Sequence, residues 1–265
     1  MRDILEAVAA GDLSPAAAEV ELSGYATTEA GRFDAAREQR RGVPEAIIAE
    51  GKTPADTATL AASAVETAGR AIVTRADAAT AESVEARAPA DATTERDERA
   101  RTVVVHAAGF EPPSLDATVA VVTAGTSDAV YAGEAAVIVR EMGAEVVWIE
   151  DVGVAHLGRI VDQLGPIREA DVTIVAAGRE GALPTVVAGL VNTPVIGLPI
   201  STGYGHGGDG EAALSGMLQS CTVLSVVNVD AGFVAGAQAG LIARAVDGRA
   251  SDQGASDQGA TDDGV

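Results

Sequence analysis

The chain has 265 residues, of which 47% are hydrophobic and only 3% aromatic. A core built from Ala, Val, Leu and Ile is therefore expected, in one or two domains. No apolar run approaches the roughly 18 residues that a membrane span requires. The N-terminus lacks the apolar centre of a signal peptide, and a single cysteine excludes an intrachain disulfide. We expect a cytoplasmic protein.

The charge balance restricts the choice of partners. The 39 acidic and 18 basic residues give a formal net charge of −21. A surface this negative repels phosphate backbones and anionic membranes, so neither nucleic acid nor a membrane is an expected partner. Lys52 is the one lysine of the chain. An acid-rich, lysine-poor composition is typical of a halophilic protein, although GC-rich codon usage would also remove lysines.

The first hundred residues are predicted to form a small α-rich domain. Apolar residues recur at helical spacing over residues 1–10, and Ser14 is a suitable N-cap for a second helix up to residue 22. A dense polar segment covers 31–54. A helix at 55–68, a strand at 71–74 and a helix at 79–86 follow. The polar stretch 88–100 is expected to be a solvated linker.

From residue 101 the pattern changes to apolar, β-branched runs that alternate with helical stretches. Strands are expected at 103–105, 118–122, 145–149, 171–175, 194–198 and 223–229, and helices at 128–141, 157–169, 182–190, 210–220 and 232–245. Strands that are apolar throughout indicate a parallel sheet covered on both faces. We therefore predict a doubly wound, three-layer α/β domain over 101–247. The repeated SDQGA of 248–265 predicts a disordered acidic tail.

Ligands of parallel α/β sheets collect at the carboxyl ends of the strands, and two of these ends are rich in small residues. In the first, 123–128, Gly125 permits a tight turn. Thr126, Ser127 and Asp128 there can cap a helix, hold a phosphate or, in the case of Asp128, accept a hydrogen bond from a ribose. In the second, 177–184, Gly178 precedes Glu180. That carboxylate is either a general acid or base or a favourable charge near a helix start.

A third strand end, 197–210, holds six glycines in fourteen residues together with Ser201. A core does not need so many glycines, because each costs conformational entropy. We expect the backbone around Ser201 and Gly203 to approach a ligand closely. A flexible lid or a neutral loop are the alternatives.

Cys221 follows the predicted helix at 210–220. The electronegative C-terminal end of that helix disfavours a thiolate, and the position is at the end of the sheet away from the other candidates. Cys221 is therefore either a packed, inert thiol or a nucleophile that needs groups from another segment or subunit. The three scattered histidines and one cysteine do not make a metal signature.

A positive cluster lies in the polar segment of the N-terminal region. Its members Arg37, Arg40, Arg41 and Lys52, which lie close in sequence to Asp34, could clamp a phosphate or carboxylate of a substrate. Alternatively, the arginines could pair with Asp34, Glu38 and Glu45 within the chain. The sequence leaves both possibilities open.

Several segments together resemble the LarB family, the pyridinium-3,5-biscarboxylic acid mononucleotide synthases of nickel-pincer cofactor biosynthesis. The segments are DAAREQRRGVPEAIIAEGKT, TAGTSDAVYAGEAA, AGREGALPTVVAGL and ALSGMLQSCTVLSVVNVDAGF. The C-terminal half of that family belongs to the PurE (aminoimidazole ribonucleotide carboxylase) superfamily. The resemblance implies a flavodoxin-like, PurE-type fold and a homo-oligomer.

The resemblance also implies an activity. Nicotinic acid adenine dinucleotide would be carboxylated by CO2 at C5 of its pyridinium ring and its phosphoanhydride cleaved, with release of AMP. Cys221 would be the covalent nucleophile and Glu180 would move the ring proton. No tightly bound cofactor is implied, and a role for Mg²⁺ is left open. The expected substrate contacts are Asp34, Arg37, Arg40, Lys52, Gly125, Thr126, Ser127, Asp128, Gly178, Ser201 and Gly203.

Two other functions remain compatible with the sequence. The first is a purine-pathway aminoimidazole ribonucleotide carboxylase or mutase, although its electron-rich substrate needs no thiol. The second is a non-catalytic nucleotide-binding module in which Cys221 only packs.

Overall fold

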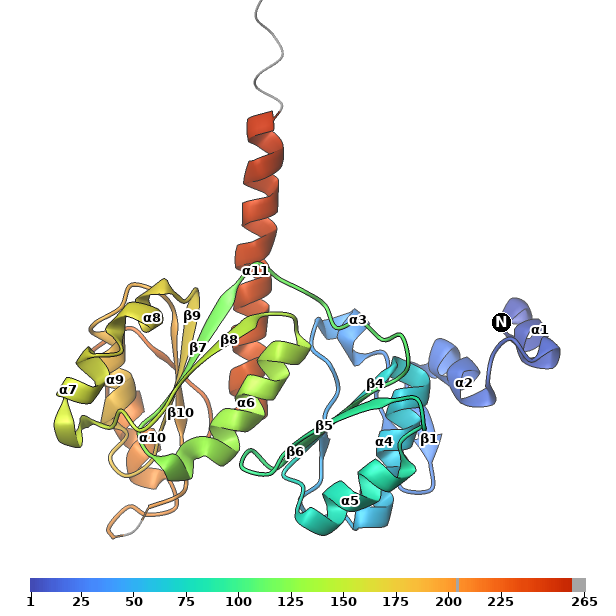
Figure 1. The fold of residues 1–265 in the computed structure, drawn as a ribbon, viewed down its shortest axis with the longest axis horizontal. Helices are drawn as coiled ribbons and strands as arrows, with labels where there is room; N and C mark the ends of the chain where they lie inside the picture. Colours follow the sequence, from blue (N-terminus) through green and yellow to red (C-terminus); the bar gives the residue numbers. More distant parts are fainter. Residues whose placement is uncertain (204, 259–265) are drawn as a thin grey trace, which may run out of the picture. The chain divides into compact units, whose positions relative to one another are not determined.

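The computed structural model describes residues 1–203 and 205–258. The chain divides into two compact units, Met1–Glu111 and a second that starts at Pro112, and each is described by itself (Figure 1).

The N-terminal unit is built on a four-stranded sheet with the order β3-β4-β6-β5. The strands are β3 (Ile47–Ile48), β4 (Arg70–Thr74), β5 (Thr93–Asp97) and β6 (Thr102–His106). Helices α4 (Pro54–Ala68) and α5 (Ala78–Arg87) pack on the sheet face that carries Val73 and Val103. Alternate residues of β4 and β6 thus point into one core, as a strand's two-residue period requires.

Smaller elements precede this sheet. They are α1 (Arg2–Ala10), α2 (Pro15–Ser23), a hairpin of β1 (Ala26–Thr28) with β2 (Gly31–Phe33), and α3 (Arg37–Arg41). The predicted N-cap is confirmed, because the Ser14 hydroxyl accepts a hydrogen bond of 3.1 Å from the Ala17 amide. The unit is therefore mixed α/β rather than α-rich.

Two assignments in this region were wrong. The stretch 88–100, expected to be a linker, contains β5, and the strand expected at 103–105 in the C-terminal sheet is β6. Both belong to the N-terminal sheet, where β6 pairs antiparallel with β4 and β5. Strand β5 was missed because it lies at the sheet edge with mostly exposed polar side chains, and its pairing uses only backbone groups.

The C-terminal unit contains a five-stranded parallel sheet with the order β11-β10-β9-β7-β8. Its strands are β7 (Thr118–Thr123), β8 (Glu145–Ile149), β9 (Val172–Ala177), β10 (Val195–Pro199) and β11 (Ser225–Val226). Counted from β7, this is the flavodoxin-like order 2-1-3-4-5. The predicted doubly wound fold is confirmed.

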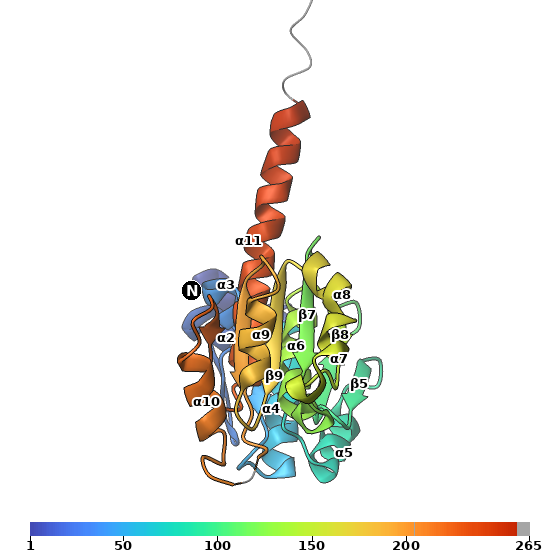
Figure 2. The same cartoon turned by 90° about the vertical axis from the view of Figure 1, so that its left-hand side faces the viewer.

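Helices cover both faces of this sheet (Figure 2). On one face, α6 (Ala129–Glu141) and α11 (Gly232–Gln258) pack against Val121 and Ile174. On the other, α7 (Gly158–Val161), α8 (Leu164–Glu169), α9 (Ala182–Ala188) and α10 (Glu211–Leu218) pack against Val122 and Val175. Neighbouring residues of each central strand thus serve opposite cores, which explains their continuous apolar pattern.

Helices α6 and α11 approach each other along a row of glycines in α11. An added Cβ at Gly236 would lie 2.5 Å from the Ala135 carbonyl oxygen, and one at Gly232 would meet the Tyr131 carbonyl oxygen. The backbone of α11 therefore rests directly on α6 at these positions.

Helix α11 continues to Gln258 and so enters the segment 248–265 that was expected to be disordered. Extending an existing helix needs no new nucleation, which is why an acidic repeat can continue one. Residues 259–265 of that segment lie outside the described residues. Within the described part of the chain, none of the helices combines the length and apolar composition needed to cross a membrane.

Candidate functional site

The strand order reverses between β7 and β9, and the crevice of a doubly wound fold lies at this point, outside the carboxyl ends of the strands. A pocket of about 410 Å³ is found there. The turn after β7 and the loop after β9 line it, together with the segment after β8. Its main lining residues are Gly125, Ser127, Asp128, Gly153, Val154, Arg159, Gly178, Arg179, Glu180 and Thr202.

Asp128 closes the turn after β7, which forms the short helix η1 (Thr126–Asp128). Its Oδ2 accepts a hydrogen bond of 2.8 Å from the Gly125 amide, and its Oδ1 lies 3.5 Å from the Ser127 hydroxyl. Burial raises the pKa of Asp128, and the bond from Gly125 opposes that shift. Asp128 thus shapes the turn and also lines the pocket, whereas Thr126 is not among the lining residues.

The loop after β9 presents Glu180 on a tightly packed backbone. The Gly181 amide donates to the Gly178 carbonyl oxygen at 2.9 Å. An added Cβ at Gly178 would lie 2.5 Å from the Thr202 carbonyl oxygen. Gly181 has a φ of +63°, and a Cβ there would lie 2.5 Å from the Ala213 carbonyl oxygen. Both positions therefore require glycine.

Glu180 is exposed and stands at the junction of two hollows. It lines the 410 Å³ pocket and also an adjoining one of about 220 Å³, where Arg179, Gly203 and His206 are further lining residues. Its carboxylate can therefore reach a ligand in either hollow.

Four glycines of the glycine-rich loop, Gly203, Gly207, Gly208 and Gly210, line the smaller hollow. Gly207 and Gly210 have φ values of +70° and +81°, and a Cβ at Gly210 would lie 2.5 Å from Val229 Cγ1. The fold itself thus requires glycine at these two positions. Gly203 lines the smaller hollow, whereas Ser201 lines neither of the two.

Cys221 lies near the amino ends of the strands, on the side of the sheet opposite to the crevice. It follows the end of α10 by three residues. It is exposed and lines a pocket of about 880 Å³ with Val195, the first residue of β10, and Ser225, the first of β11. Among the described residues of one C-terminal unit, Cys221 and Glu180 therefore line different pockets.

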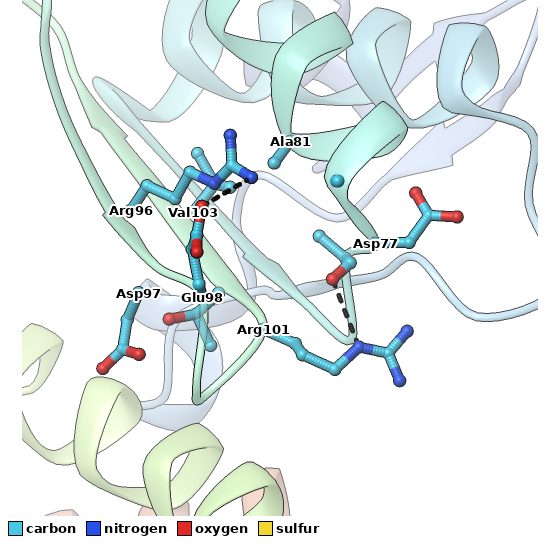
Figure 3. Close-up of a pocket in the computed structure, with 10 residues that line it drawn as sticks. Asp77, Ala81, Arg96, Asp97, Glu98, Arg101 and Val103 are labelled. Atoms are coloured by element: carbon cyan, nitrogen blue, oxygen red, sulfur yellow. Dashed lines mark hydrogen bonds and ion pairs between the residues drawn. The ribbon is translucent and has the colours of Figure 1, made fainter.

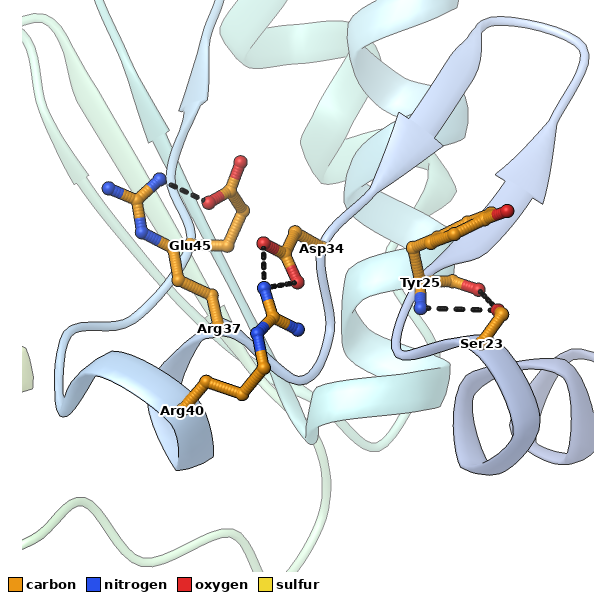
Figure 4. Close-up of polar contacts among 6 residues, drawn as sticks. All are labelled: Ser23, Tyr25, Asp34, Arg37, Arg40 and Glu45. Atoms are coloured by element: carbon orange, nitrogen blue, oxygen red, sulfur yellow. Dashed lines mark hydrogen bonds and ion pairs between the residues drawn. The ribbon is translucent and has the colours of Figure 1, made fainter.

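The predicted positive cluster of the N-terminal unit forms ion pairs within the chain (Figure 4). Arg37 Nη1 lies 2.6 Å from Glu45 Oε2, and Arg40 Nη2 lies 2.7 Å from Asp34 Oδ2. The hydrogen bond to Asp34 raises the pKa of Arg40. Lys52 Nζ donates to the Ile48 carbonyl oxygen at 2.7 Å. A substrate anion would have to compete with these partners.

The same unit contains another hollow, of about 290 Å³, lined by charged side chains (Figure 3). Arg96 pairs with Glu98 at 3.1 Å, and Arg101 Nε donates to the Ala76 carbonyl oxygen at 3.2 Å. Asp77 caps α5 by accepting from the Thr80 amide. Each of these three side chains therefore already has a partner within the N-terminal unit.

Arg159 is a lining residue of the crevice that sequence reasoning missed. Its Nη1 lies 2.9 Å from Asp151 Oδ1, and its Nη2 donates to the Gly153 carbonyl oxygen at 3.3 Å. Its Nε is buried without a hydrogen-bond partner among the described residues. An arginine shortly after a strand end in so acidic a chain was the available signal.

Three charged residues with left-handed backbone follow strands of this sheet. Asp151, Arg179 and Asp230 have φ values of 55°, 53° and 57°. Such conformations are uncommon outside glycine and cluster at functional sites. In the described ranges 1–203 and 205–258, no group of three or more His, Cys, Asp or Glu could hold a metal ion.

Comparisons with known proteins agree with this architecture. Residues 25–107 match the family described as LarB/PurE-like N-terminal domain, and residues 118–257 match AIR carboxylase. A protein of Methanocaldococcus jannaschii, named as uncharacterized, is 36% identical over 252 residues, which cover 92% of this chain and 97% of its own length.

A crystal structure of a PurE2 variant from Treponema denticola is similar over 57% of this chain and 99% of its own. Its identity is 19% and its TM-score 0.38, too low to support an argument. The two family matches assign the family without it. The chain belongs to the PurE superfamily, with the LarB-like architecture of an N-terminal domain joined to an AIR carboxylase domain.

Proposed function

We propose that this protein carboxylates C5 of the pyridinium ring of nicotinic acid adenine dinucleotide and hydrolyses its phosphoanhydride. The products are pyridinium-3,5-biscarboxylic acid mononucleotide and AMP. Members of the LarB/PurE family are carboxylases. The observation that carries the finer proposal is the union of both domains in a chain whose single thiol is exposed beside a large pocket.

The chemistry explains why a thiol is useful. The electron-poor ring cannot attack CO2 through C5. Addition of the Cys221 thiolate to C4 or C6 gives a dihydropyridine whose nitrogen donates electrons to C5. C5 then forms a bond to CO2, Glu180 removes the C5 proton, and expulsion of the thiolate restores the aromatic ring. Water cleaves the phosphoanhydride in a separate step.

The crevice offers suitable contacts for the nucleotide. Gly125 and Ser127 present a turn with a backbone amide and a hydroxyl, and Arg159 and Arg179 bring positive charge to a pocket of a chain whose net charge is −21. Guanidinium groups and backbone amides are typical phosphate ligands. We propose that Arg37, Arg40 and Lys52 contact the substrate only after exchanging their present partners, and that Mg²⁺, if used, is carried in by the phosphates.

The separation of Cys221 from Glu180 has a consequence for assembly. Both residues act on one ring in this mechanism, yet they line pockets at opposite edges of the sheet. We therefore propose that a homo-oligomer supplies Cys221 and Glu180 to one site from two copies. Light scattering of the active species should show more than one chain.

The same separation favours a second candidate, carboxylation of an aminoimidazole ribonucleotide. That substrate is electron-rich and needs no thiol, so the crevice with Glu180 would suffice. The decisive experiment supplies each substrate with labelled bicarbonate and identifies the products by mass spectrometry. Label in a pyridinium dicarboxylate, lost in Cys221→Ser, supports the first function; label in the aminoimidazole product, kept in Cys221→Ser, supports the second.

A matched control for the thiol is available close by. Ser220→Ala changes the adjacent residue, whose hydroxyl lies 2.7 Å from the Thr222 hydroxyl, and removes no sulfur. Ser220→Ala should keep the turnover that Cys221→Ser loses. Binding of either nucleotide without turnover of both would instead indicate a non-catalytic module.

A further inference from the structure

The turn after β11 contains an aspartate with two contacts to the end of β10. Asp230 Oδ1 accepts a hydrogen bond of 2.8 Å from the Ser201 amide. The Asp230 amide donates to the Pro199 carbonyl oxygen at 2.9 Å. Its φ of 57° is left-handed, a conformation that surrounding contacts must stabilise in a residue other than glycine. Asp230 therefore fixes where β10 ends and the glycine-rich loop begins.

The same turn also contacts the far end of that loop. Val229 covers Gly210, where an added Cβ would lie 2.5 Å from Val229 Cγ1. Asn228 Oδ1 accepts a hydrogen bond of 2.9 Å from the Val229 amide. The turn 228–230 thus holds both ends of the loop 201–210, while several residues between them are exposed.

The start of the loop supports the backbone that carries Glu180. A Cβ at Gly178 would lie 2.5 Å from the Thr202 carbonyl oxygen, and one at Gly203 would lie 3.6 Å from the Arg179 amide nitrogen. The segments 201–203 and 178–180 are therefore in direct backbone contact. A displacement of Ser201 must be transmitted to Glu180, because neither Gly178 nor Gly203 has a side chain that could rearrange to accommodate it.

We propose that Asp230 is a positioning residue for Glu180, acting through Ser201 and Thr202. This role depends on the proposed function in one respect, namely that Glu180 removes a proton from the substrate. Asp230 touches no substrate in this scheme. It sets the distance between the Glu180 carboxylate and the bound ring.

The test compares substitutions that keep or remove the acceptor. Asp230→Asn keeps an oxygen at Oδ1, and both asparagine and glycine tolerate a left-handed backbone, so Asp230→Gly removes the acceptor without adding strain. Asp171 provides the matched control. Its Oδ2 accepts a 2.8 Å bond from the Thr118 amide, at the amino ends of β9 and β7, away from Glu180.

Turnover of nicotinic acid adenine dinucleotide should depend on the acceptor. A catalytic group displaced by about 1 Å can lose about a hundredfold in rate, so kcat should fall about ten- to a hundredfold in Asp230→Gly. Asp230→Asn and Asp171→Ala should both retain most of the activity. In a Glu180→Gln chain, adding Asp230→Gly should cause no further loss, because Asp230 acts through the missing carboxylate.

Hydrogen exchange gives a readout that needs no substrate. The Ser201 amide should exchange at least tenfold faster in Asp230→Gly than in Asp230→Asn or the unaltered chain. Unchanged exchange at Ser201, or a further loss of kcat in the Glu180→Gln background, would overturn the positioning role. Absence of turnover in the unaltered chain would overturn the proposed function instead, with the exchange difference intact. Urea denaturation checks folding, and Asp230→Ser replaces Asp230→Gly if the latter does not fold.

Discussion

The row of glycines between α6 and α11 allows a test of packing that is independent of function. An added Cβ at Gly236 would lie 2.5 Å from the Ala135 carbonyl oxygen and 2.9 Å from Ile138 Cβ. Since ordinary contacts begin at 3.4 Å, Gly236→Ala would require the two helices to separate by about 1 Å, which overpacks their interface.

Two effects of opposite sign compete in this substitution. Alanine in place of glycine within a helix stabilises it by ~1 kcal/mol. Overpacking a close-packed interface costs ~1–3 kcal/mol, and the high end applies here because the obstacle is backbone rather than a flexible side chain. Gly236→Ala should therefore lower the free energy of unfolding by ~1–2 kcal/mol.

Gly248, on the same helix, is the matched control. An added Cβ there meets no atom within 4 Å, so Gly248→Ala should raise the free energy of unfolding by up to ~1 kcal/mol. Urea denaturation followed by circular dichroism, at one fixed salt concentration, measures both changes. If Gly236→Ala were as stable as the unaltered chain, the direct backbone contact between α6 and α11 would be refuted.

Three further predictions concern the crevice. Burial raises the pKa of Asp128 above its ordinary 3.8, so its stabilising contribution is complete below that pH and is lost as pH rises through the folded pKa. Asp128→Asn should therefore gain stability relative to the unaltered chain as pH rises from 3.8. Urea denaturation at a series of pH values measures this, and a difference in the free energy of unfolding that does not change with pH would contradict it. Gly181→Ala should lose at least ~1 kcal/mol of stability from its left-handed backbone, whereas Gly165→Ala, where a Cβ meets nothing within 4 Å, should not. Arg159→Lys keeps the charge but loses the planar fork, and the KM for the dinucleotide should rise about tenfold; a fall in kcat alone would exclude the binding role.

The central sheet was predictable because its strands are buried on both faces. Residues 119–122 and 172–175 are all apolar or β-branched, and their alternation with helices leaves few possible topologies. The strand order then places the loops with Gly125 and Glu180 at one crevice. Short or edge strands such as β3 and β5 were not predicted, because strands that pair mainly through backbone groups have no distinctive amino-acid composition.

The partners of charged side chains could not be predicted in the same way. The spacing of Arg37 and Arg40 fitted a phosphate clamp as well as an ion-pair network, and only the folded chain shows Glu45 and Asp34 beside them. Arg159 was missed because its role depends on Asp151 and Gly153, whose position follows from the turn after β8. The sequence predicted that Cys221 lies at the end of the sheet away from the other candidate residues. It did not predict the large pocket that Cys221 lines.

The left-handed residues Asp151, Arg179 and Asp230 have a consequence for evolution in the laboratory. Each such conformation costs a non-glycine residue on the order of 1 kcal/mol, which glycine would relieve, but glycine in place of Asp151 or Asp230 would also remove the ion pair with Arg159 or the hydrogen bond from Ser201. Arg179 lines the crevice, Asp151 pairs with the lining residue Arg159, and Asp230 binds the Ser201 amide next to the lining residue Thr202. A library screened only for heat survival should therefore accept glycine first at Arg179, whereas a library screened for turnover should keep the contacts of Asp151 and Asp230.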